Sequence, residues 1–73
     1  MEDRKYSLKE LRARKNVTQV ETAKAIGISV PAYIAWEKDA SNVGISNIYA
    51  LAEYFQVDIK EIKLRRKNEI NKR

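Results

Sequence analysis

Hydrophobic residues along the chain recur at three- and four-residue spacing, and no segment alternates between polar and apolar residues as a half-buried strand would. Residues 45–55 illustrate this spacing, because five apolar side chains fall on one helical face: Ile45, Ile48, Leu51, Ala52 and Phe55. Long segments are also rich in Ala, Leu, Glu and Lys, which favour helices. The pattern predicts an all-α fold.

Three capping motifs mark where helices begin. Ser7 and Thr18 each open an S/T-x-x-E capping box, in which the side chain at each end accepts a hydrogen bond from the backbone amide at the other end. Asp58 opens an acidic variant of the same box. We therefore expect helices over residues 8–15, over residues 19–26 and from about residue 59 onward.

Asn16 and Gly27, which tolerate a left-handed backbone, end the first two helices. Ser29 is placed to cap a further helix that runs to about Lys38, with Pro31 in the first turn, where a missing amide costs nothing. A turn then leads into the helix described above. The prediction is a compact bundle of five short helices.

Length and composition narrow the class of protein. At 73 residues the chain is one small domain, near the lower limit for a lone hydrophobic core. It contains no Cys and no His, which removes thiol nucleophiles, disulfides, most zinc sites and the commonest general base. We therefore expect no enzyme activity, no metal and no cofactor. The charged segment "MEDRKYSLKE" and the lack of a long apolar run favour a cytoplasmic protein without signal peptide or membrane span.

The formal net charge of +5 suits a polyanionic partner. Its distribution is uneven, because residues 60–73 carry seven basic and two acidic side chains, whereas the preceding 59 residues carry eight of each. We divide the chain into a domain of residues 1–64 and a basic tail of residues 65–73, which either extends the last helix or is disordered. The tail either adds non-specific affinity for phosphates or keeps a small protein soluble.

The spacing of residues around Gly27 is the one that a helix-turn-helix requires. A small residue must let two helices cross, a glycine must supply a left-handed turn, and apolar residues must bury the inner face of the second helix. Counted from Gln19 as the first position, the fifth, ninth, tenth, fifteenth and eighteenth positions are Ala23, Gly27, Ile28, Tyr33 and Trp36.

From Leu8 to Ile62 the sequence resembles the Cro and lambda-repressor-like family of helix-turn-helix proteins. The resemblance rests on "LKELR" (8–12), "VTQ" (17–19), Ala23, "IGIS" (26–29), "WE" (36–37) and "LAEYFQVDIKEI" (51–62). It implies that the helix after Gly27 enters the major groove of double-stranded DNA and that the helix over residues 19–26 lies across the backbone. Thr22 and Val20 depart from the family, which usually has Leu and Glu there, so either the core is looser or Val20 faces a neighbour.

The resemblance implies roles for individual residues. Thr18 and Gln19 are expected to anchor a phosphate through a helix N-terminus and a side-chain amide, although Thr18 also reads as a plain N-cap. Arg12 and Glu37 correspond to a partly buried structural salt bridge between two helices. Three residues after the groove-binding helix either touch phosphates or form a solvated turn: Lys38, Ser41 and Asn42.

The base-reading positions of the family fall here on Ser29, Val30, Pro31, Ile34 and Ala35. Apart from the Ser29 hydroxyl, none can form the hydrogen bonds by which Arg reads guanine or Gln reads adenine. The apolar residues would touch thymine methyls, follow groove shape, or pack against a second copy or another protein. Tyr33, where a smaller aliphatic residue is usual, is expected to reach outward to a phosphate.

Two functions are compatible with this fold. The first is a transcriptional regulator of phage repressor or Cro type, bacterial or phage-encoded, that binds operator DNA as a homodimer on a two-fold site. The second is a protein-interaction module, similar to an antitoxin or an antirepressor, that uses the apolar helix face on a protein partner. Exchanging Gln19 and Lys38 for Glu and measuring DNA binding and dimerisation separately distinguishes the two.

Overall fold

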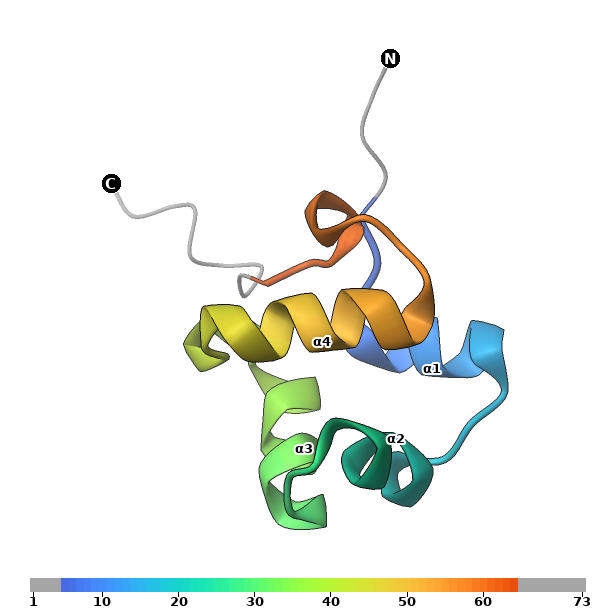
Figure 1. The fold of residues 1–73 in the computed structure, drawn as a ribbon, viewed down its shortest axis with the longest axis vertical. Helices are drawn as coiled ribbons and strands as arrows, with labels where there is room; N and C mark the ends of the chain where they lie inside the picture. Colours follow the sequence, from blue (N-terminus) through green and yellow to red (C-terminus); the bar gives the residue numbers. More distant parts are fainter. Residues whose placement is uncertain (1–4, 65–73) are drawn as a thin grey trace.

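Four α-helices and two short 3-10 turns make up the described part of the computed structural model, residues 5–64 (Figure 1). The elements in chain order are α1 (Leu8–Lys15), α2 (Gln19–Ile26), α3 (Val30–Lys38), η1 (Ala40–Asn42), α4 (Ile45–Phe55) and η2 (Ile59–Glu61). The predicted all-α fold is confirmed, and the first four helices have the expected bounds. The predicted tail of residues 65–73 lies outside the described residues, and the division of the chain at residue 64 stays a prediction.

The capping boxes form as the sequence predicts. Ser7 Oγ accepts from the amide of Glu10 at 3.1 Å, and the Glu10 carboxylate accepts from the amide of Ser7 at 2.8 Å. Thr18 and Glu21 repeat this exchange at the start of α2, at 3.0 and 2.8 Å. Each box satisfies two amides near the helix start, so these local signals fix where α1 and α2 begin.

The prediction of a fifth helix is wrong. The Asp58 box forms, with the amide of Asp58 donating to Glu61 at 3.1 Å, but it supports only the single turn η2. Ile62 is then extended and pairs with Tyr6 in an isolated parallel bridge. The amide of Tyr6 donates to the Glu61 carbonyl and that of Lys63 to the Tyr6 carbonyl, both at 2.8 Å. This pairing uses backbone groups that a continuing helix would need.

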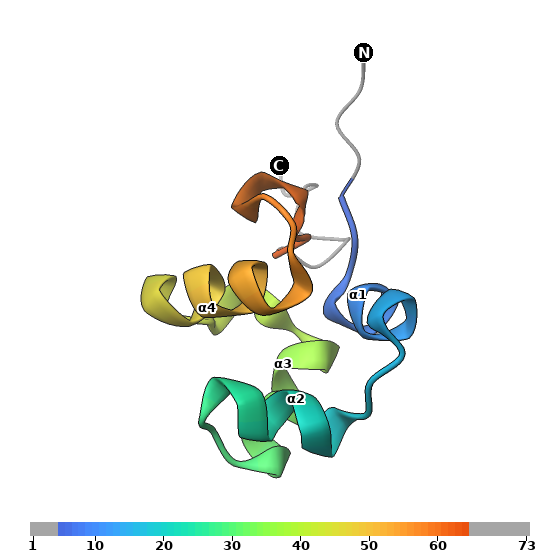
Figure 2. The ribbon, with the colours of Figure 1, turned by 45° about the vertical axis from the view of Figure 1, so that its right-hand side comes forward.

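Helix α4 lies at the centre of the fold. In both views it separates the α2–α3 pair from η2 (Figure 1, Figure 2). Leu51 of α4 is completely buried, and the same helix contributes Ile48, Ala52 and Phe55 to the core. The remaining core residues come from other segments: Leu8, Leu11, Ala23, Tyr33, Val43 and Ile62. Within residues 5–64, no helix combines the length and the apolar character needed to cross a bilayer.

The buried face of α4 begins one turn later than the sequence predicts. Ile45 was expected on that face but is 64% exposed, whereas Ile48 is buried. Val43, from the segment before the helix, is buried in the core instead. The first turn of α4 therefore lies at the edge of the core.

The two departures from the family pattern on α2 have a simple structural outcome. Thr22 is completely buried, and its hydroxyl donates to the Thr18 carbonyl at 2.9 Å, so the polar side chain is satisfied. Val20 points away from the core and is 51% exposed.

Candidate nucleic-acid interface

A tight turn sets the angle between α2 and α3. Gly27 ends α2 in the left-handed region, with a φ of 84°, and the amides of Gly27 and Ile28 both donate to the carbonyl of Ala23, at 2.9 and 3.0 Å. Ala23 is completely buried, and its small side chain permits a close approach of the helices. Ser29 then caps α3, with its Oγ accepting from the amide of Ala32 at 3.2 Å.

Helix α3 has an inner face in the core and an outer face toward solvent. Tyr33 is buried and Trp36 packs half-buried against the core, whereas the opposite side is accessible. The outer face, called the α3 ridge below, consists of residues that are exposed or half-buried: Ser29, Val30, Pro31, Ile34 and Ala35. Val30 forms its edge, because it also packs against the core. The predicted base-reading residues therefore lie together on one accessible surface.

Tyr33 does not belong to this surface, and the expectation that its hydroxyl reaches a phosphate is wrong. The residue is 0% exposed, and its ring lies edge-on to Trp36 with 6.4 Å between centroids. Its hydroxyl oxygen is buried without a hydrogen-bond partner among the described residues. Burial, and secondly the neighbouring Glu37, raise the pKa of this hydroxyl. Helical spacing indicates that position 33 faces inward, but not that a phenol ring fits there completely.

Arg12 of α1 and Glu37 of α3 form a partly buried ion pair. Arg12 Nε lies 2.6 Å from Glu37 Oε2, and Nη2 lies 3.3 Å from Oε1. The two side chains are only 19% and 7% exposed. Burial raises the pKa of Glu37, but the hydrogen bonds that it accepts from Arg12 and from Gln19 outweigh burial and hold the pKa below its ordinary value.

Gln19 connects this ion pair to the start of α2, a contact that the sequence analysis missed. Its Nε2 donates to Glu37 Oε1 at 3.0 Å. One hydrogen of the amide is thereby used, and the second N–H remains to donate elsewhere. No local pattern reports this contact, because the two residues lie on different helices.

The turn after α3 carries the other predicted phosphate contacts. Lys38, Ser41 and Asn42 are all exposed. The Ser41 hydroxyl and amide both donate to Asp39 Oδ1, at 2.7 and 3.1 Å, which fixes η1. A phosphate at this turn would therefore meet Lys38 or Asn42 more readily than the Ser41 hydroxyl.

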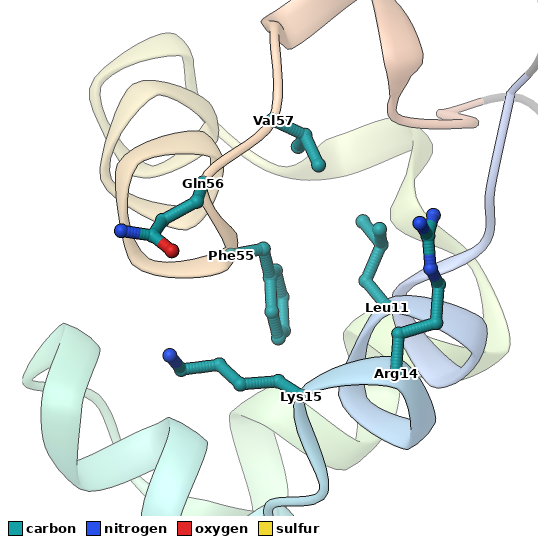
Figure 3. Close-up of a pocket in the computed structure, with 6 residues that line it drawn as sticks. All are labelled: Leu11, Arg14, Lys15, Phe55, Gln56 and Val57. Carbon is teal, nitrogen blue, oxygen red and sulfur yellow. The ribbon is translucent and has the colours of Figure 1, made fainter.

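A hollow between the ends of α1 and α4 lies outside the helix-turn-helix (Figure 3). Its lining comprises Leu11, Arg14, Lys15, Phe55, Gln56 and Val57. The two cations at its edge also rest on aromatic rings, Arg14 on Tyr6 at 4.6 Å and Lys15 on Tyr54 at 5.0 Å. These lining residues include no carboxylate.

Two short helices joined by a tight glycine turn, with the outer face of the second one accessible, define a helix-turn-helix of the kind that docks on duplex DNA. A family profile described as Helix-turn-helix matches residues 8–62, most of the chain. The chain belongs to this Cro/C1-type helix-turn-helix family of DNA-binding regulators, and the predicted resemblance is confirmed. No curated protein matches the chain significantly.

Proposed function

We propose that the protein is a sequence-specific, cytoplasmic transcriptional regulator of phage repressor or Cro type. In this proposal α3 lies in the major groove and the start of α2 lies on the phosphate backbone. One observation carries it: the side chains of the α3 ridge are accessible. Helix α3 itself lies on the side of α4 opposite η2 (Figure 2). A helix about 10–12 Å across matches the width of the major groove, about 12 Å.

The start of α2 supplies donors for one phosphate. The capping box uses the amide of Glu21, and helix geometry leaves the amides of Gln19 and Val20 without a carbonyl partner inside the helix. The positive end of the helix dipole and the second N–H of the Gln19 side chain add to this attraction. Lys38 at the C-terminal end of α3 and Asn42 in the turn that follows supply the contact with a second phosphate. Contacts of this kind fix the position of α3 in the groove.

Binding by two copies is part of the proposal. On α4, Ile45 and Tyr49 lie one turn apart and are 64% and 55% exposed. Large apolar side chains that share an exposed face are suited to packing against a second copy of the chain. A two-fold dimer would place its α3 helices in successive major grooves, about 34 Å apart.

The proposal is tested by fluorescence anisotropy on operator fragments and on random duplexes over a salt series. Lys38→Glu with Asn42→Asp removes the second phosphate contact and should abolish binding. Gln56→Glu with Lys60→Glu makes the same change in net charge outside the α2–α3 pair and should preserve specific binding. Gln19→Glu is less suitable, because the new carboxylate would face Glu37. Equal losses in both double variants, or equal affinity for operator and random DNA at every salt concentration, would contradict the proposal.

The second candidate is the protein-interaction module, similar to an antitoxin or an antirepressor. The apolar character of Pro31, Ile34 and Ala35 supports it, since such a ridge also suits a protein surface. In that case no duplex would be enriched from a random pool, and Ile34→Lys would disrupt a protein complex while leaving the fold intact.

A further inference from the structure

The α3 ridge lacks any group that reads a base through paired hydrogen bonds. Its exposed and half-buried side chains that end in carbon are Val30, Pro31, Ile34 and Ala35. Ser29 is the polar exception, and its Oγ already accepts from the amide of Ala32 at 3.2 Å, which leaves one O–H to donate. Discrimination of guanine by Arg or of adenine by Gln needs two hydrogen bonds from one side chain. The ridge must therefore select DNA by another property.

The major groove offers an apolar ridge one kind of partner. Nearly all the distinguishing groups on the base edges are nitrogen or oxygen donors and acceptors, and the hydrocarbon among them is the C5 methyl of thymine. 5-Methylcytosine carries a methyl on the same ring carbon, whereas uracil and cytosine carry a hydrogen there. Thymine and 5-methylcytosine thus look alike to a side chain that contacts only C5.

We propose that the α3 ridge selects DNA by its C5 methyl groups. Thymine and 5-methylcytosine are accepted where the ridge meets the bases, and uracil and cytosine are disfavoured. Methylation of cytosine at C5 in a suitable half-site then creates a binding site for this protein. The inference rests on the proposed function, because it needs α3 in the major groove.

The charges around the ridge favour DNA over a protein as its occupant. The one carboxylate of α3 belongs to Glu37, which is 7% exposed and paired with Arg12. Lys38 is the exposed charge at the end of the helix, and Asp39, the half-buried residue that follows, accepts hydrogen bonds from Ser41. The positive end of the α2 dipole lies at Gln19, whose side chain contacts Glu37. An apolar strip with positive groups beside it matches a groove with methyl groups on its floor and phosphates along its edges.

The expected effect of one methyl is modest. Burial of a single methyl group gives about a fourfold change in affinity, by the usual transfer value for one carbon. Strong selectivity therefore needs several methyls, and two half-sites double the number contacted.

The test uses the unaltered protein and one randomised duplex pool copied in three ways: with thymidine and cytidine, with deoxyuridine in place of thymidine, and with 5-methyldeoxycytidine in place of deoxycytidine. The three pools share their sequences and base pairing and differ in methyl groups. We expect enriched sequences in the first pool, loss of that enrichment in the uracil pool, and additional sites with 5-methylcytosine at thymine positions in the third. Non-specific binding at low salt should be the same in all three pools.

Single replacements then separate contact from shape. In a selected operator, each thymine is exchanged for uracil in turn, and affinity should fall about fourfold at the few positions under the ridge. Changes in DNA shape would instead spread over positions that the protein does not contact. Lys38→Gln serves as the protein control, because loss of a phosphate contact should weaken binding to every pool by the same factor.

The possible outcomes are distinct. Specific enrichment that survives replacement of thymine by uracil overturns the methyl inference and leaves the proposed function standing. Absence of specific enrichment in every pool overturns both, and would be the result for a protein-interaction module. Methyl-dependent enrichment supports both.

Discussion

Glu37 joins the core of the domain to the proposed DNA-binding surface. Its carboxylate accepts from Arg12 at 2.6 Å and from the side chain of Gln19 at 3.0 Å. One residue of α3 therefore holds a side chain of α1 and a side chain from the first turn of α2. The arrangement makes Glu37 a positioning residue for Gln19, because the partly buried ion pair holds the side-chain amide of Gln19 in one orientation.

We predict that Arg12→Met destabilises the domain by about 3 kcal/mol, because it leaves the nearly buried Glu37 carboxylate without its partner. The double variant Arg12→Met with Glu37→Met should recover much of this loss, since it buries no unpaired charge. The free energy of unfolding in urea, followed by fluorescence of the single tryptophan, Trp36, measures both. A double variant that is less stable than Arg12→Met would contradict this account.

The lowered pKa of Glu37 predicts a dependence of stability on pH. The folded pKa lies below its ordinary value of 4.5, so the unfolded chain binds more protons in this range and stability falls as the pH drops below about 4.5. Above that value this contribution is constant. Urea unfolding of the Glu37→Gln variant between about pH 3 and pH 6 should give a flatter profile, whereas Glu53→Gln, an exposed change on α4, should leave the profile as it is. Equal slopes in the two variants would assign the acid sensitivity to other carboxylates.

At the level of elements, Gly27 controls the angle between α2 and α3 through its backbone alone. A Cβ added there would meet no heavy atom of the described residues within 4 Å, so a larger side chain is limited by the φ of 84° and not by space. We predict that Gly27→Ala costs about 1 kcal/mol. Gly27→Asn should cost less, since Asn tolerates this region and Asn16 already adopts it with a φ of 62°. Thermal unfolding of the two variants gives the comparison, and a loss of several kcal/mol with Asn would show that packing matters here.

Element boundaries followed from the sequence where the signals are local. The boxes opened by Ser7 and Thr18 and the left-handed residues Asn16 and Gly27 act within one turn of the chain, and all four have the predicted geometry. The fifth helix was predicted from an equally good box at Asp58, but there a long-range contact decides. Ile62 pairs with Tyr6 from the start of the chain, and no local pattern reports such a pairing.

Side-chain placement was harder to predict than the elements. Periodicity located the inner faces of α3 and α4, but not how deep each position lies. The Tyr33 hydroxyl is therefore buried although it was expected to reach outward, and Ile45 is exposed although it was expected on the inner face. The contact between Gln19 and Glu37 was also missed, since it depends on how three helices meet. The α3 ridge residues could be assigned to one surface from the sequence, because that assignment requires only that a helix begins after Ser29.

At the scale of the whole molecule, the described residues present two separate groups of accessible apolar side chains, with Val20 on α2 outside both. The α3 ridge is proposed to meet DNA, and Ile45 with Tyr49 on α4 to meet a second copy. These surfaces must act together, because a ridge that gains about fourfold per methyl needs two half-sites to select an operator. A substitution that weakens dimerisation should therefore also weaken sequence selectivity.

We predict that Tyr49→Lys shifts the protein from dimer to monomer, because a charge would have to be buried at the α4 surface. Val20→Lys is the matched control: Val20 is 51% exposed, close to the 55% of Tyr49, but lies on α2. Sedimentation equilibrium without DNA should give the mass of a monomer for Tyr49→Lys and of a dimer for Val20→Lys. On a two-fold operator Tyr49→Lys should bind no more tightly than on a single half-site, while the unaltered protein prefers the full site. If both variants keep the dimer mass, the two copies meet elsewhere, and if the unaltered chain is a monomer at every concentration, α4 serves no such role.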